Sequence, residues 1–318
     1  MPIWISPQLI LQLDDLLTYH YLVPSTTNRA SVPRLSPLLL FSILFAISLA
    51  IWFRPLISSF ALALHDDQYT HILLIIPVSV ALIFLDWKSR VASTTFSLSL
   101  GAILLASAAL MTAVAKLSLV ALRPDEQLSV RMLALVAWWI GSFILSFGAR
   151  SFKRALFPLC FLFWIVPLPE IMLNPIVRLL QAGSAASARL LFAAVGMPVT
   201  QDGTLITIPG LTIEVARECS SIRSSLMLVV TTMVLAQMLL RSPWRKALVI
   251  VVAIPLSVVK NGLRIFVLGM LGTRVDPSFL TGRLHHQGGI IYFLIALAAI
   301  FLLLWMARRG DEQPGISP

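Results

Sequence analysis

The sequence predicts an all-α fold, a polytopic integral membrane protein with about eight transmembrane helices. Of the 318 residues, 58% are hydrophobic and only 12% are charged, about half the charged share of an ordinary soluble domain. The mean hydropathy is +0.91, and several apolar stretches approach the roughly 20 residues that a helix needs to cross a bilayer. The predicted spans are 36–53, 70–87, 94–115, 128–147, 155–169, 219–240, 247–268 and 287–307.

These spans divide the chain into three parts. We predict an N-terminal cytoplasmic segment at 1–35, a transmembrane domain at 36–307 and a cytoplasmic tail at 308–318. The first segment lacks the pattern of a cleavable signal peptide. The fifth span is short and contains two prolines, so it is expected to be kinked or to extend further.

The basic residues indicate how the chain lies in the membrane. The net charge of +10 does not indicate nucleic-acid binding, because the charge is spread over short clusters between apolar runs. Such clusters are typical of loops kept on the cytoplasmic side. They are Lys88–Arg90, Arg150–Arg154, Arg241–Lys246 and Arg308–Arg309. With all four inside, both termini are cytoplasmic, and the starts of the sixth and eighth spans face the extracytoplasmic side.

The long segment 170–218 is the largest piece outside the predicted spans. Its first part resembles a helix with Pro175 in its first turn and Gly196 as its stop. Such a helix could lie in the membrane interface or form an imperfect span. The following stretch alternates apolar and polar residues around Pro209-Gly210 and predicts a small hairpin.

Three polar features meet at the extracytoplasmic face in this topology. Cys219 begins the sixth span, Arg264 lies near the outer end of the seventh, and His285 begins the eighth. This combination fits nucleophilic acyl transfer, in which a thiolate attacks a carbonyl and a histidine moves the proton. A guanidinium can stabilise the developing oxyanion. The start of a helix also favours a thiolate through its exposed N–H groups.

Further residues could support this chemistry. Ser220 can supply a hydroxyl, Lys260 lies on the helix face of Arg264, and His286 is an alternative to His285 as the proton shuttle. Other interpretations remain open. Arg264 and Lys260 could extend to the lipid headgroups, and the two histidines could be ordinary interfacial residues. Arg217, Glu218 and Arg223 could be a solvated helix entrance. No Cys/His spacing suggests a metal or another cofactor, and Cys160 lies in an apolar run.

Three motifs at these positions resemble the exosortase/archaeosortase family of membrane cysteine transpeptidases. E-C-S-S-I-R at 218–223 resembles the family's A-C-S-G-I-R nucleophile motif, with Glu218 and Ser221 at the positions that differ. N-G-L-R-I at 261–265 resembles its N-x-x-R motif, which includes Asn261. L-H-H-Q-G-G at 284–289 resembles its histidine-then-glycine motif. Upstream, Y-T-H-I-L-L-I-I-P at 69–77 resembles the family's Y-S-H-G segment.

The resemblance implies an enzyme of the cytoplasmic (inner) membrane, with its active site outside. The expected substrates are exported proteins that end in a short motif (often Pro-Glu-Pro), a transmembrane helix and a basic tail. Cys219 would form a thioester, His285 would act as acid and base, and Arg264 would stabilise the oxyanion. The alternative is a membrane transporter or channel, or a scaffold subunit, linked to exopolysaccharide export. In a transporter or channel, Lys260 and Arg264 would line an anion path. In a scaffold subunit, Arg264 would matter for folding.

Overall fold

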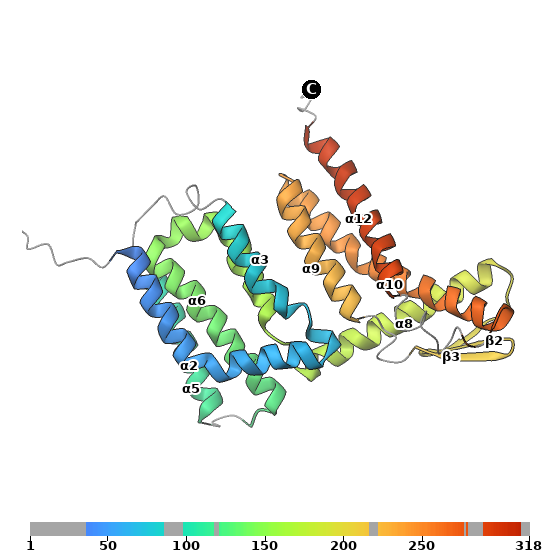
Figure 1. The fold of residues 1–318 in the computed structure, drawn as a ribbon, viewed down its shortest axis with the longest axis horizontal. Coiled ribbons are helices and arrows are strands. Elements are labelled where there is room, and N and C mark those ends of the chain that lie inside the picture. Colours follow the sequence, from blue (N-terminus) through green and yellow to red (C-terminus); the bar gives the residue numbers. More distant parts are fainter. Residues whose placement is uncertain are drawn as a thin grey trace, which may run out of the picture. The chain divides into compact units, whose positions relative to one another are not determined.

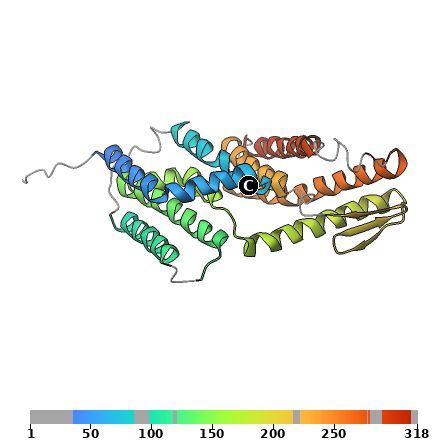
Figure 2. The same ribbon diagram turned by 60° about the horizontal axis from the view of Figure 1, so that its bottom comes forward.

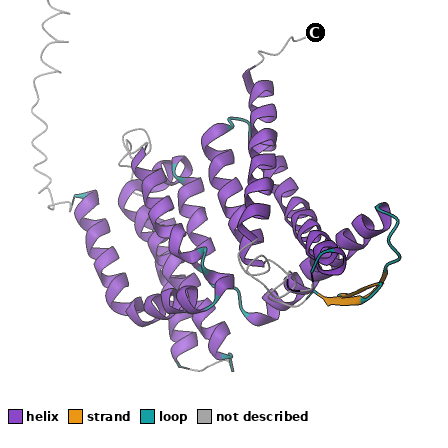
Figure 3. Ribbon diagram, turned by 45° about the vertical axis from the view of Figure 1, so that its right-hand side comes forward, coloured by secondary structure: helices purple, strands orange, loops and turns teal. Residues whose placement is uncertain are grey.

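The computed structural model describes residues 36–85, 98–117, 121–215, 222–276, 278 and 289–312. The described part of the chain is mostly helical and adds one small sheet, as Figure 3 shows. The longer helices are α2 (Pro37–His65), α3 (Ile72–Leu85), α5 (Leu98–Lys116), α6 (Pro124–Arg154), α8 (Glu170–Ala194), α9 (Ile222–Leu239), α10 (Pro243–Arg274) and α12 (Gly289–Glu312). The short elements are η1 (Asp67–Tyr69), α7 (Leu156–Phe161), η2 (Leu162–Ile165), β1 (Thr200–Asp202), β2 (Leu205–Ile208) and β3 (Leu211–Glu214).

The predicted number of membrane spans is confirmed. Within the described residues, seven helices are long and apolar enough to cross a membrane, and a bent pair can make an eighth. That pair covers the predicted fifth span: α7 and η2 end at Ile165, and the chain turns by 94° into α8. Pro167 and Pro169 explain the break, because a residue before proline is pushed out of the helical conformation. Val166 is accordingly extended.

Several predicted spans were too short; the fourth, for example, was predicted to end at residue 147, whereas α6 continues to Arg154. The first span was predicted to stop at residue 53, but α2 continues past Arg54 to His65 with a kink at Trp52. Pro55 accounts for the kink, because it has no N–H for the helical ladder. The seventh span was predicted to end at 268, whereas α10 continues to Arg274. α10 has 32 residues. At 1.5 Å per residue it is about 48 Å long, which exceeds the thickness of the bilayer core.

The first helices share one core, with α6 packed against both α2 and α5. Indole N–H groups fix α6 to α2: Trp138 donates to the carbonyl of Leu44 at 3.0 Å, and Trp139 donates to Ser48 Oγ at 2.8 Å. Aromatic side chains fill much of the remaining space, including the buried Trp52 and Phe161. The indole donors of Trp138 and Trp139 are thus satisfied, whereas the buried Nε1 of Trp52 has no hydrogen-bond partner among the described residues.

The last helices form a second packed group. α9, α10 and α12 lie side by side (Figure 1) and share a small apolar core that includes Leu228, Ala253 and Ile300. Because α9 and α12 both pack on α10, the first turns of α9 and α12 are brought to the middle of the longer helix.

The sheet and α8 cover the second half of α10. The strands pair antiparallel in the order β1-β2-β3, and Ile208 faces Leu211 across the predicted turn at Pro209-Gly210. Gly210 has a φ of 81°, which the glycine of a type II turn adopts readily. The predicted hairpin is therefore confirmed, with β1 as an additional strand. The predicted helix in this segment is also present, but it begins at Glu170, so Pro175 lies inside it.

α8 and the second half of α10 run parallel and very close together (Figure 2). Gly183 lies opposite Val258, Gly262 lies against Ser187, and Gly269 lies against Phe192. A Cβ added at Gly262 would contact Ser187 and would stand 3.0 Å from the backbone nitrogen of Ala188. The glycine therefore permits the approach that holds Lys260 and Asn261 against their neighbours.

We expect Gly262→Ala to lower the Tm of the detergent-solubilised protein, despite alanine's higher helix propensity. The new methyl group meets backbone atoms, which cannot move unless the helices separate, so the cost should be about 1–3 kcal/mol. Gly183→Ala is the matched control, because its methyl group meets only the side chain of Val258. A Tm at or above the wild-type value for Gly262→Ala would contradict this account of the α8–α10 contact.

Candidate active site

The predicted site residues fall into two groups. Arg264, Asn261 and Lys260 lie on α10. Cys219, Ser220, His285 and His286 lie outside the described residues. The site is therefore built from α10 and from the helix ends that adjoin the other four positions: α9 begins at Ile222 and α12 begins at Gly289.

The polar stretch of α10 is unusually buried for charged residues. Lys260 is only 5% exposed and Asn261 only 1%, and Arg264 is half-buried with its Nε atom covered. Charged groups at this depth in an apolar helix need compensating contacts. The Lys260 ammonium finds one, because it donates a hydrogen bond to Ser224 Oγ. This contact directs the Lys260 ammonium toward the first turn of α9.

Lys260 contacts α9, and Arg264 lies within electrostatic range of α12. Ser224 is in the first turn of α9, so the Lys260 contact fixes α10 to the start of that helix. Tyr292, in the first turn of α12, lies within electrostatic range of the Arg264 guanidinium. Lys260 and Arg264 also act on each other electrostatically, as expected one helical turn apart. Two positive charges thus lie between the two helix starts.

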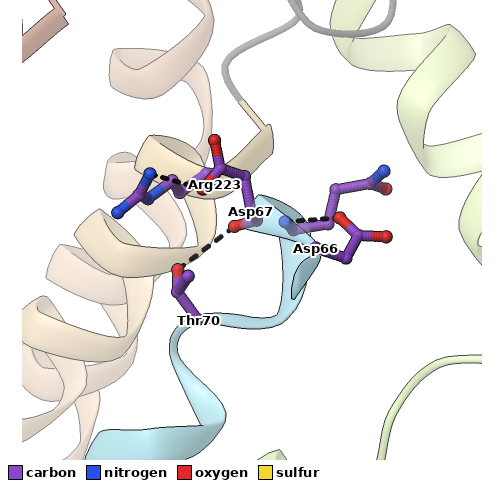
Figure 4. A network of polar contacts seen from close by, with 5 residues as sticks. Asp66, Asp67, Thr70 and Arg223 are labelled. Atoms are coloured by element: carbon purple, nitrogen blue, oxygen red, sulfur yellow. Dashed lines mark hydrogen bonds and ion pairs between the residues drawn. The ribbon is translucent and has the colours of Figure 1, made fainter. Parts of the chain in front are cut away.

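The start of α9 also contacts the turn between α2 and α3. Arg223 Nη1 lies 2.6 Å from Asp67 Oδ1 in η1, as Figure 4 shows. The turn itself is held by local hydrogen bonds: the Gln68 N–H donates to Asp66 Oδ1 at 2.9 Å, and Thr70 Oγ1 donates to the carbonyl of Asp67 at 3.1 Å.

The same turn is joined to the segment before α8. The hydroxyl of Tyr69 donates to the carbonyl of Leu168 at 3.0 Å. His71 is 6% exposed, lies edge-on to Trp164 with 6.2 Å between ring centroids, and has a ring nitrogen 3.2 Å from the carbonyl of Gln68. The stretch 69–77, singled out by resemblance, therefore lies at the end of the bundle where α9 begins.

The N-termini of α6 and α8 meet at this end as well. Ser129 Oγ donates to the carbonyl of Pro167 at 2.6 Å, and the N–H of Glu170 donates to Asp125 Oδ2 at 2.9 Å. Segments distant in sequence are thus assembled around the start of α9.

Two of the predicted cytoplasmic clusters meet at the opposite end of α9. Arg245 Nη1 donates to the carbonyl of Ala307 at 3.1 Å, and Lys246 Nζ donates to Gln237 Oε1 at 2.8 Å. Gln237 and Ser224 are 13 residues apart on α9, which corresponds to about 20 Å along the helix. The basic loop and the polar stretch of α10 are therefore separated by much of a membrane thickness.

Sequence reasoning missed one member of this region, Asp67. Nothing in a single sequence connects it with Arg223, which is 156 positions away; only its place two residues before the Y-T-H stretch could have drawn notice. Cys160 is exposed on α7. Among the described residues, no group of three His, Cys, Asp or Glu side chains could hold a metal ion.

Comparison with known proteins gives one match. A family model described as transmembrane exosortase matches residues 63–302, a range that begins near the end of α2 and ends within α12. No curated protein and no solved structure matches the chain.

Proposed function

The chain belongs to the transmembrane exosortase family, and from this premise we propose that it is a cysteine peptidase or transpeptidase that cleaves C-terminal sorting signals. Family membership implies a role in processing the sorting signals of exported proteins. We propose that the substrates end in a short motif, a transmembrane helix and a basic tail. The cleaved protein is then released or transferred to a cell-surface acceptor.

The proposed chemistry uses Cys219, His285 and Arg264. The Cys219 thiolate attacks the carbonyl carbon of the scissile peptide, and the Arg264 guanidinium stabilises the negative charge that develops on the carbonyl oxygen. The C–N bond then breaks, and the imidazolium of His285 gives its proton to the leaving nitrogen. The trimmed substrate remains as a thioester on Cys219 until water or an amine attacks it with His285 as the base.

The observation that supports this site best is the polar stretch of α10, where Lys260 contacts the first turn of α9 and Arg264 lies within electrostatic range of Tyr292 in the first turn of α12. Cys219 lies three residues before Ile222, and His285 lies four residues before Gly289. The length of the intervening chain limits the Cα–Cα distance from Cys219 to Ile222 to about 11 Å. The same limit from His285 to Gly289 is about 14 Å. Both side chains are therefore tethered close to helix starts that adjoin Lys260 and Arg264.

The remaining residues have supporting roles in this proposal. Lys260 adds a second positive charge that favours the thiolate and the oxyanion, and its bond to Ser224 holds the start of α9 against α10. Asn261 is buried one position further along α10. Ser220 is a hydroxyl donor next to the nucleophile. In this proposal the site faces the extracytoplasmic side of the inner membrane. The basic residues around Arg245, which contacts the end of α12 at the other end of α9, support this orientation.

The test uses the host's own exported proteins that end in a short motif, an apolar helix and a basic tail. One of them, carrying an N-terminal epitope tag, serves as the reporter. Membranes that contain the full-length chain are expected to shorten the reporter by the length of its helix and tail, measured by immunoblot and mass spectrometry. His285→Ala should abolish the shortening, and His286→Ala, its matched control, should leave much of it.

Two outcomes of this assay decide between the proposals. If no such reporter is shortened in membranes with the wild-type chain, the peptidase proposal fails and the transporter or scaffold alternative replaces it. If His286→Ala abolishes the shortening and His285→Ala does not, the proton shuttle moves by one residue and the reaction stays the same.

A further inference from the structure

We infer that the ion pair between Asp67 and Arg223 is a positioning device that holds the start of α9, and with it Cys219, in the reactive arrangement. This inference rests on the proposed function and adds two residues to it. Arg223 Nη1 and Asp67 Oδ1 are 2.6 Å apart, on elements that are 156 positions apart in the sequence. Neither residue touches the reacting atoms in this account.

The turn that carries Asp67 is held by local hydrogen bonds. Asp66 caps η1 by accepting the N–H of Gln68, and Thr70 closes the turn on the carbonyl of Asp67 (Figure 4). Tyr69 fixes the turn to the carbonyl of Leu168, beyond η2. The backbone at Asp67 is therefore held in place on the first group of helices.

Arg223 lies in the first turn of α9. It is the second residue of the helix, four positions after Cys219. A shift or rotation of this first turn would move whatever the chain attaches to it. A misplacement of about 1 Å at a reacting group can cost about 100-fold in rate. The ion pair ties this turn to η1, and the Lys260–Ser224 bond ties it to α10.

The role of this ion pair in positioning α9 can be separated from its contribution to folding stability. The Arg223 side chain is 53% exposed and that of Asp67 is 77% exposed. Exposed ion pairs contribute little to folding. Loss of this pair should therefore change the Tm by no more than about 3 °C while it slows the reaction.

Arg223 could instead act directly, through the effect of its charge on the Cys219 thiolate. A substitution at Asp67 distinguishes this direct effect from positioning of α9. If only the arginine charge mattered, removal of the opposing carboxylate would leave the rate unchanged or raise it. If the pair positions α9, Asp67→Asn must slow the reaction as much as Arg223→Gln. The double variant must then be no slower than either single variant, because both changes remove the same contact.

The experiment measures kcat and KM for the reporter with the full-length enzyme in detergent. We expect Arg223→Gln, Asp67→Asn and the double variant each to lower kcat by about three- to fivefold, the largest effect that an exposed ion pair can have, with KM unchanged. Arg223→Lys, which can still meet the carboxylate, should retain much of the rate. Arg189→Gln on α8 and Asp202→Asn on β1 are the matched controls, because each removes one exposed charge elsewhere, and both should process the reporter normally.

Two results would overturn the inference: a wild-type rate for Asp67→Asn, or single effects that multiply in the double variant. Neither result touches the proposed function, which stands or falls with Cys219. If Cys219→Ala abolishes processing while Asp67→Asn remains fully active, only the positioning role is lost. If Cys219→Ala itself processes the reporter at the wild-type rate, the proposed function fails.

Discussion

Replacement of Arg264 by lysine is expected to slow reporter processing by about 100- to 1,000-fold, the usual loss when one oxyanion donor is removed. Lysine keeps the positive charge between the starts of α9 and α12, but it loses the planar guanidinium that can present two N–H groups at once. Arg264 is half-buried and its Nε atom is covered, so this part of the guanidinium lies against neighbouring atoms.

The measurement is kcat for the reporter, with the Tm as a check on folding. Arg274→Lys at the end of the same helix is the matched control, because Arg274 is exposed and should tolerate lysine. Arg264→Ala should be at least as slow as Arg264→Lys. Near-normal turnover with lysine at position 264 would show that charge alone suffices there, and would exclude the directional role in oxyanion binding.

The membrane architecture could be predicted from the sequence because it depends on composition along the chain. Apolar runs of sufficient length must become helices in a bilayer, since no other open structure satisfies its own backbone. The spans were therefore found, and so was the hairpin at Pro209-Gly210, where the turn chemistry is local. The largest boundary error is in α2, which continues through Pro55 to His65, while the expected kink in the fifth span is a full break at Val166.

The candidate site was only partly predictable. Arg264 and Lys260 attract notice because charge within an apolar run is costly, and motif resemblance adds the neighbouring positions. The partners of these residues are a different matter. Ser224 beside Lys260, Tyr292 beside Arg264 and Asp67 beside Arg223 follow from how α9, α10, α12 and η1 pack. Such contacts between distant segments leave no periodic pattern in a single sequence.

The small residues show the same limit. Gly183, Gly262 and Gly269 are each compatible with an ordinary membrane helix, where glycine is frequent. Only the packing of α8 on α10, with Gly183 of α8 opposite Val258 and with Gly262 and Gly269 of α10 against α8, shows that they permit a close parallel contact. Spacing along α10 alone does not tell which neighbour the glycines face.

The central claim is that Cys219 forms a covalent thioester with the trimmed substrate. Cys219 is the cysteine of the nucleophile motif, and a thiolate is a stronger nucleophile near neutral pH than the hydroxyl of Ser220. Cys219→Ala should accumulate full-length reporter in the membrane. Cys160→Ser is the matched control, since Cys160 is exposed on α7, and it should process the reporter normally.

The most direct measurement is mass spectrometry of the wild-type enzyme after brief incubation with the reporter and an acid quench. The account predicts a peptide containing Cys219 that carries the C-terminal residue of the trimmed reporter, and release of this adduct by neutral hydroxylamine, as expected of a thioester. The Cys219→Ala enzyme should give no such adduct. Wild-type trimming by the Cys219→Ala enzyme, or an adduct on another residue, would contradict the account.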